Sequence, residues 1–134
     1  MADAVTSTTI VDDDRKAVIQ LTNTSDGNGE SAVTKIDVSA LATRKSDGAT
    51  CTGCKLAKVT YTTFGMSVKL LWDATTDTIC LDLNENYSDQ LDLTEFGGIQ
   101  NTSGSGKTGD INLTTTGHAS GDSYVIVLTV IKTF

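Results

Sequence analysis

Residues 124–131, near the end of the chain, are almost all β-branched, aliphatic or aromatic. Successive side chains of a strand point to opposite faces, and both alternating sets of this run are suited to burial. Such a strand needs cover on both faces, from a second sheet or from a neighbouring subunit. A second strand-like run occupies residues 111–116, and a loop with a glycine near each end joins the two. We predict that the two runs form a hairpin at the centre of a sheet.

Alternation of apolar and polar residues predicts further strands along the rest of the chain. The expected strands span residues 5–11, 15–23, 32–41, 56–64, 66–73, 78–83 and 91–93. A helix over residues 38–43 is the alternative for the end of the third of them. Residues 44–54 are expected to form an exposed loop, and residues 84–90 an irregular one, because both segments are polar.

The strongest hairpin signal joins residues 66–73 to residues 78–83, because two alternating patterns flank a short polar turn. The side chains expected to face the core from these two strands are Met66, Val68, Leu70 and Trp72, and Ile79, Leu81 and Leu83. In the strand before them, Ala57, Val59 and Tyr61 are expected to face the core.

Composition supports short strands joined by polar turns. Thr, Ser, Gly, Asp and Asn are plentiful, aromatic residues make up 5% of the chain, and Pro is absent. The 134 residues are expected to form a single β domain, 1–134, with residues 1–12 as an N-terminal arm or an edge strand. The predicted fold class is all-β: an antiparallel β-sandwich or barrel, jelly-roll-like, of about eight to nine short strands.

The formal net charge is −7, from 17 acidic and 10 basic residues, and the basic residues are scattered along the chain. Proteins that bind a phosphate backbone usually carry clustered basic residues, so we expect no nucleic-acid binding here. We also expect no membrane association and no secretory signal, because no apolar window approaches the length of a span and the first residues lack a basic and an apolar segment.

Cys51 and Cys54 have the Cys-x-x-Cys spacing of zinc and redox sites. A zinc site needs two further ligands, and the remaining candidates, Cys80 and His118, lie at the wrong spacing. A redox pair belongs at a helix N-terminus that follows a strand, whereas this pair precedes a strand. We interpret the cysteines as free thiols made in a reducing compartment; a disulfide formed after release from the cell and a metal site are the alternatives.

Four further features are weighed as sites. Residues 104–108, Gly-Ser-Gly-Lys-Thr, resemble the end of a phosphate-binding loop, but Asn101 stands where its first glycine belongs. Residues 82–86 resemble the start of a calcium loop, but Tyr87 and Leu93 replace its glycine and its final carboxylate. The aspartates at 12–14 are a weak cation candidate, and His118 has no nucleophile elbow beside it. We expect turns, loops and a loop histidine here, with no catalytic residue, no cofactor and no metal; the protein is expected not to be an enzyme.

Stretches distributed over nearly the whole chain carry a resemblance to one family. They include Gln-Leu-Thr-Asn-Thr-Ser-Asp-Gly-Asn-Gly-Glu at residues 20–30, Leu-Trp-Asp-Ala at 71–74 and Gly-Lys-Thr-Gly-Asp-Ile at 106–111, together with residues 9–11, 15–18, 34–41, 96–99, 117–118 and 121–124. The pattern resembles small virion structural proteins of tailed bacteriophages that infect aquatic bacteria. The resemblance implies a component of the virus particle.

Small β-rich proteins of this size in tailed phages often decorate the capsid shell, commonly as trimers. The resemblance therefore implies a capsid decoration or cement protein, a homo-oligomer (trimer) on the outer capsid surface of the virion, which is made in the host cytoplasm and bridges subunits of the major capsid protein. The alternatives are a tail or neck structural component and a glycan-binding host-attachment module.

The segment expected to contact a neighbouring subunit is the β-branched run near the N-terminus. Its contact residues are expected to be Val5, Thr6, Thr8, Thr9, Ile10 and Val11. A strand added to the sheet edge of a neighbour binds through backbone hydrogen bonds and tolerates sequence change. Removal of residues 1–11 should then weaken attachment and leave the isolated fold intact.

Overall fold

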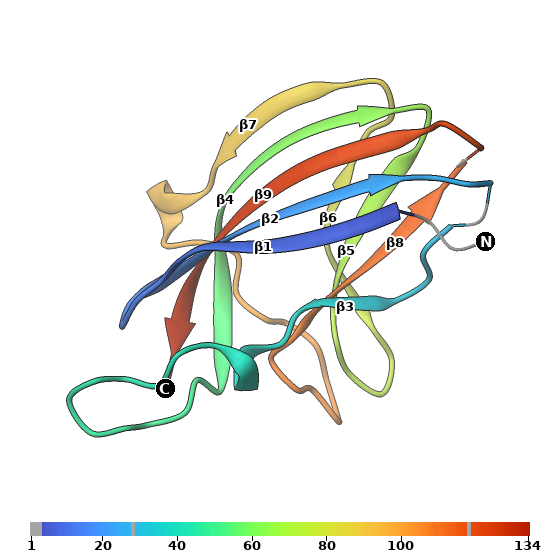
Figure 1. Ribbon diagram of the computed structural model, residues 1–134. Coiled ribbons are helices and arrows are strands. Elements are labelled where there is room, and N and C mark those ends of the chain that lie inside the picture. Colours follow the sequence, from blue (N-terminus) through green and yellow to red (C-terminus); the bar gives the residue numbers. More distant parts are fainter. Residues whose placement is uncertain (1–3, 28, 118) are drawn as a thin grey trace.

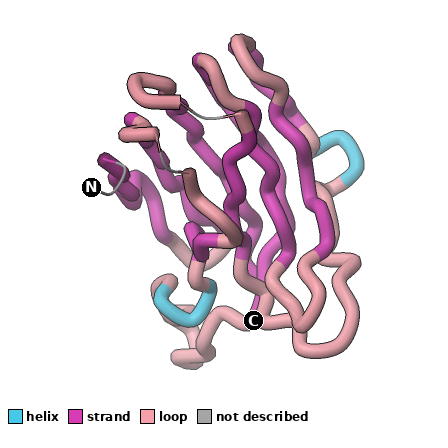
Figure 2. Tube along the Cα trace, turned by 90° about the vertical axis from the view of Figure 1, so that its right-hand side faces the viewer, coloured by secondary structure: helices cyan, strands magenta, loops and turns pink. Residues whose placement is uncertain are grey.

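The computed structural model describes residues 4–27, 29–117 and 119–134. Over these residues the chain forms nine strands and two short 3-10 helices, and no α-helix (Figure 1). Figure 2 shows strands that run alongside one another, with loops gathered at their two ends. The elements are β1 (Ala4–Asp12), β2 (Lys16–Thr24), β3 (Val33–Ile36), η1 (Val38–Ala40), β4 (Gly53–Phe64), β5 (Ser67–Trp72), β6 (Thr78–Leu83), β7 (Ser88–Asp92), η2 (Thr94–Phe96), β8 (Ile111–Thr116) and β9 (Ser123–Thr133).

The strands are divided between two antiparallel sheets. Sheet A has the order β1-β2-β9-β4-β7, and sheet B has the order β3-β8-β5-β6. The core lies between the sheets and is filled by completely buried apolar side chains. They include Leu21, Leu56, Ile126 and Leu128 from sheet A and Val68, Leu70, Trp72 and Leu113 from sheet B. The predicted all-β antiparallel sandwich is confirmed.

The predicted C-terminal hairpin is wrong. β8 pairs with β3 and β5 in sheet B, whereas β9 pairs with β2 and β4 in sheet A. The chain therefore crosses from one sheet to the other between Thr116 and Ser123. Both strands are interior strands of their sheets, which is why both runs are suited to burial. Their sequences do not reveal the crossing, because a loop of this length fits a hairpin or a sheet change.

Other parts of the described chain cover only one of the two faces of β9. Tyr124, Ile126, Leu128 and Val130 are buried against sheet B. On the other face Val125 is 43% exposed and Ile131 is 36% exposed. The second sheet thus covers one face of β9, and the outer face of sheet A is left open to solvent.

The hairpin of β5 and β6 is confirmed, but its second strand is phased differently from the prediction. Met66, Val68, Leu70 and Trp72 are all completely buried, as expected. Leu70 pairs with Leu81 and Leu71 pairs with Ile79, so Cys80 is an extra residue in β6. A bulge of this kind reverses which side chains face inward. Leu83 is therefore buried while Ile79 is 56% exposed, and the prediction that Ile79 faces the core is wrong.

A second bulge explains an unexpected pair of buried neighbours in β4. The register of β4 against β9 shifts between Leu56 and Lys58, and Leu56 and Ala57 are both buried. Val59 and Tyr61 are buried as predicted.

Two predicted boundaries differ from the observed ones. The strand expected over residues 32–41 is only the four-residue β3, because the chain turns into η1, where the Asp37 side chain caps the backbone N–H of Ser39. Residues 88–90, expected to be irregular, belong to β7.

One buried carboxylate joins the two sheets. Glu30 accepts hydrogen bonds from the Asn23 amide (2.7 Å) and the Tyr124 hydroxyl (2.5 Å) of sheet A. Its carboxylate also forms an ion pair with Lys35 of β3, and its backbone N–H donates to the Thr115 hydroxyl of β8 (2.9 Å). A buried charge is tolerated when its partners are this complete, so this network fixes the position of sheet A over sheet B.

Candidate functional site

All six residues predicted to contact a neighbour lie in β1, at one edge of sheet A. Val5 is 45% exposed and Ile10 is 55% exposed, while Thr6, Thr8 and Thr9 are exposed and Val11 is half-buried. Val5 and Thr9 pair with the buried residues Asn23 and Ile19, so they point to the core side of the sheet. They are nevertheless exposed, and both faces of β1 are therefore accessible.

β1 is also the least protected of the four edge strands. Edges are usually blunted by shortness, by charged side chains or by bulges. β7 has five residues, two of them aspartates, β3 has four residues with a lysine, and β6 has six with an aspartate and a bulge. β1 has nine residues, and its only charged residue is the last, Asp12. Its register is regular from Ala4 to Thr9 and shifts before Val11. We refer to residues 4–9 as the free edge.

The end of β1 is held by a lysine that the sequence analysis missed. The Lys132 side chain is completely buried, and its Nζ donates to Asp12 Oδ1 (2.7 Å), the Asp13 carbonyl (2.8 Å) and the Ala42 carbonyl (2.6 Å). Lys132 lies two residues beyond the buried Val130, so the alternation of β9 places the Lys132 side chain on the core side of the strand as well. The three aspartates at 12–14 serve as acceptors in this turn, since Asp13 accepts from the backbone of Arg15 and Lys16 and Asp14 from that of Lys45.

The free edge continues into an uncharged area on the outer face of sheet A. Cross-strand pairs align into two rows of five side chains, Thr6, Thr22, Val125, Thr62 and Ser88, and Thr8, Gln20, Val127, Thr60 and Gln90. None of these ten is charged, in a chain with a net charge of −7. The hydroxyl, amide and aliphatic groups of these ten side chains make this area suited to contact with another surface.

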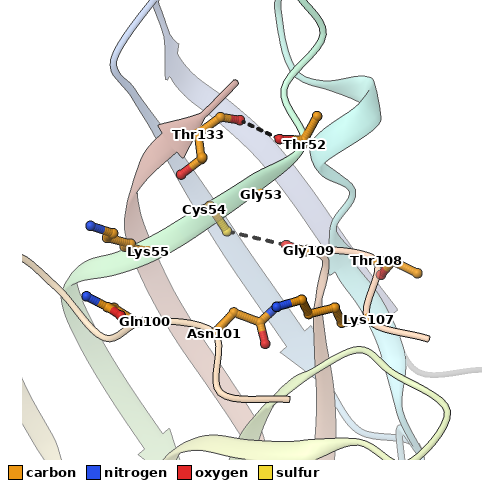
Figure 3. Close-up of a pocket in the computed structure, with 10 residues that line it drawn as sticks. All are labelled: Thr52, Gly53, Cys54, Lys55, Gln100, Asn101, Lys107, Thr108, Gly109 and Thr133. Atoms are coloured by element: carbon orange, nitrogen blue, oxygen red, sulfur yellow. Dashed lines mark hydrogen bonds between the residues drawn. The ribbon is translucent and has the colours of Figure 1, made fainter. Parts of the chain in front are cut away.

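A polar pocket lies at the opposite end of β4 from Phe64. It has a volume of about 360 Å³ and is lined by Thr52, Gly53, Cys54, Lys55, Gln100, Asn101, Lys107, Thr108, Gly109 and Thr133. Figure 3 shows these residues, which come from the start of β4, the end of β9 and the segment between η2 and β8. The loop containing Gly-Ser-Gly-Lys-Thr thus contributes to a pocket, although no helix follows it.

The cysteines are more buried than a loop position suggested. Cys51 and Cys54 are 2% and 4% exposed, because the backbone N–H of Thr52 bonds to the Thr133 carbonyl and holds this segment against β9. The prediction that residues 44–54 form an exposed loop is wrong at these two positions. Burial raises the pKa of the Cys54 thiol far above its usual range and that of Cys80 to about 12. All three thiols are free, and the protonated form that these two keep is a poor nucleophile and metal ligand.

The remaining sequence motifs do not converge on a reactive centre. Asp82 and Leu83 belong to strand β6 and not to a loop. Within the described ranges, no group of three or more His, Cys, Asp or Glu side chains could hold a metal ion. His118 lies outside the described residues. No helix in the described part of the chain is long and apolar enough to cross a bilayer.

Comparison with known proteins adds no family to these observations. No protein-family model matches the chain, and a search of curated proteins found no significant match. The surfaces described above and the resemblance drawn from the sequence are therefore the features that bear on function.

Proposed function

We propose that this chain is a virion structural protein that decorates a phage capsid and cements neighbouring subunits of the major capsid protein. The observation that supports this best is the free edge of β1, a long uncharged strand edge with both faces accessible. The resemblance to small structural proteins of tailed phages supplies the class of partner.

The free edge binds by accepting a strand from a capsid subunit as a sixth strand of sheet A. Strand addition uses the unpaired backbone N–H and C=O groups of β1 for affinity. The added strand would also shield Val5 and Ile10, the two most exposed aliphatic side chains of β1. Contacts of one such protein with two subunits resist their separation, because separation exposes the buried interface again.

The first experiment is a cryo-electron-microscopy reconstruction of the intact particle. We expect density for this chain on the outer capsid surface at junctions between subunits, with a capsid segment beside β1. Density at the neck or tail would replace the proposal with the tail or neck alternative, and absence from the particle would overturn the virion class itself.

A charge placed on the free edge tests the binding mode separately. Ser7 is exposed and pairs with Leu21, so in Ser7→Lys the new ammonium group lies on the core side of β1, where it opposes a docked strand. We expect the affinity of the purified chain for particles depleted of it to fall at least about tenfold, equivalent to about 1.4 kcal/mol.

The matched control is Thr76→Lys, which adds the same charge to an exposed position of the turn between β5 and β6 in sheet B. It should bind like the unmodified chain, and thermal unfolding should confirm that both variants are folded. Equal affinity of Ser7→Lys and the unmodified chain would contradict docking at β1.

A further inference from the structure

The uncharged area on the outer face of sheet A extends beyond the two rows of side chains described above. At one end of these rows, Thr24, Ser123 and Phe64 lie side by side on the same face. At the other end, Val18 and Thr129 are paired on it. Phe64 is 64% exposed, more than any other large apolar side chain among the described residues. The area therefore presents exposed apolar groups as well as hydroxyl and amide groups.

The centre of this area carries no charge, and its one charged pair lies at a corner. Lys58 and Asp92 face each other across β4 and β7 in the row that contains Thr129, so their charges offset each other. In sheet B, by contrast, Lys69 of the interior strand β5 pairs with Asp82. The whole chain has a net charge of −7. Sheet A is therefore where a second copy can approach without bringing like charges into contact.

Four hydroxyl groups of this area are paired within the sheet. The Thr6 and Thr22 hydroxyls bond to each other, and the Thr62 hydroxyl bonds to that of Ser88 at 3.0 Å. The two pairs flank Val125 in one row. Burial of a hydroxyl group costs free energy mainly when its hydrogen bonds to water are not replaced. Because these four hydroxyls already have protein partners, another surface can cover them at a low cost.

The area is large enough for a specific interface between two proteins. The five strands of sheet A, at about 4.8 Å spacing, span about 24 Å, and the rows from Phe64 to Thr129 span about 25 Å along the strands. Two such faces together bury about 1,200 Å², and a specific interface needs about 1,000 Å² or more. Sheets pack face to face when their twists match, a condition that two copies of one sheet always meet.

We propose that the outer face of sheet A is an interface between two copies of this chain related by a two-fold axis. Contact of a face with an identical face closes the assembly at two copies, because each copy uses the same patch. The pair therefore differs from the trimer that the sequence resemblance implies. The backbone edge of β1 lies in the plane of the sheet and not on this face, so the interface is independent of the function proposed above.

The test is sedimentation velocity of the isolated full chain from about 1 to about 300 µM. We expect a species of about twice the 14.1 kDa of one chain, with a dissociation constant on the order of 10 µM for an interface of this size. A monomer at every concentration, or a species of three times the mass of one chain, would overturn the pair. No capsid particle takes part, so that result would leave docking at β1 untouched.

Salt tests whether the contact is uncharged. Added sodium chloride screens the repulsion between two negative chains and weakens ion pairs. Because the proposed interface has an uncharged centre, the dissociation constant should stay constant or fall as the salt rises from about 0.05 to about 0.5 M. A dissociation constant that rises tenfold or more would show a contact made by charges and would contradict this interface.

A lysine on the outer face of sheet A identifies the surface. Val125 is 43% exposed in β9, the middle strand of sheet A. Val125→Lys should raise the dissociation constant at least about tenfold, because the pair would bury two ammonium groups. The matched control is Ile79→Lys, which replaces another exposed aliphatic residue, 56% exposed, in sheet B. The control should change the dissociation constant less than about twofold, and equal effects of the two substitutions would contradict the interface.

A second variant keeps the test valid if Val125→Lys does not fold. Thr60→Lys places a lysine on the same face, at an exposed position of β4 that pairs with Val127 of β9. Thermal unfolding shows which variants are folded. We expect every folded variant of this face to sediment as a monomer at concentrations where the unmodified chain is paired. A folded Thr60→Lys chain that pairs as tightly as the unmodified chain would overturn the proposal.

Discussion

Lys132 illustrates how a single charged residue can define the end of a strand. An ammonium group loses its hydration when it is buried, and this cost is offset only when its hydrogens find acceptors. Here one carboxylate oxygen and two carbonyl oxygens from residues 12, 13 and 42 surround Lys132 Nζ. These acceptors come from the end of β1 and from the segment after η1. The lysine therefore fixes the end of the strand whose other end carries the free edge.

Replacement of Lys132 by methionine should lower the free energy of unfolding by about 3 kcal/mol. The apolar chain would keep much of the volume but leave the Asp12 carboxylate without its buried cation. Urea denaturation measures the change, and Lys16→Met, at an exposed position of β2, should alter stability by less than about 0.5 kcal/mol. If Lys132→Met is as stable as the unmodified chain, the buried ion pair makes no net contribution.

The bulges control which residues of an element reach the core. Cys80 is the extra residue of β6, and its insertion places Ile79 and Leu83 on opposite faces although they are four positions apart. Without the bulge, residues separated by an even number would share a face. The bulge thus decides which of two similar aliphatic side chains stabilises the sandwich.

The two residues should therefore respond differently to truncation. Leu83→Ala should lower the free energy of unfolding by about 2–5 kcal/mol, because it empties a completely buried position. Ile79→Ala should cost less than about 1 kcal/mol, because Ile79 is 56% exposed. Thermal or urea denaturation of the pair checks this, and equal losses would mean that β6 follows the regular alternation after all.

Alternation predicted the strands well and their partners poorly. The buried set of β5 and the inward residues of β2 follow from local pattern alone, because each side chain is placed by its own position in the strand. The bulges at Cys80 and near Leu56 depend on pairing with a neighbour, which the local pattern does not contain. The separation of β8 from β9 likewise follows from the whole sandwich.

The two surfaces were predictable to different degrees. The β1 segment stood out as a β-branched run, so its residues could be named from the sequence. The polar pocket could not be assembled in the same way, because its lining residues come from segments far apart in the chain that meet only where Gly109 packs on β4. The Gly-Ser-Gly-Lys-Thr motif was the one local signal for it.

At the scale of the whole molecule, the two ends of the chain contribute unequally to one sheet. β1 is an edge strand of sheet A with mostly exposed side chains, whereas β9 lies between β2 and β4 and supplies four core residues, Tyr124, Ile126, Leu128 and Val130. Loss of β1 would expose one new edge, and loss of β9 would separate β1 and β2 from β4 and β7.

Deletion of residues 1–11 should therefore leave a folded domain that unfolds cooperatively at a lower temperature. Deletion of residues 123–134, which removes β9, should abolish the cooperative transition. Circular dichroism during heating distinguishes the two results. A non-cooperative chain after the N-terminal deletion would show that β1 is needed for the fold itself and would weaken its assignment to docking.

The place of β9 also has a consequence for how the protein is made. Translation proceeds from the N-terminus, so β1, β2, β4 and β7 all leave the ribosome before the strand that joins them has been synthesised. Pairings between residues this distant in sequence form slowly, because the entropy of closing a long loop is lost before the new contacts contribute stability. Sheet A therefore stays incomplete until β9 has been synthesised. β1 and β2 can pair with each other earlier, but they join β4 and β7 in one sheet only after β9 has emerged.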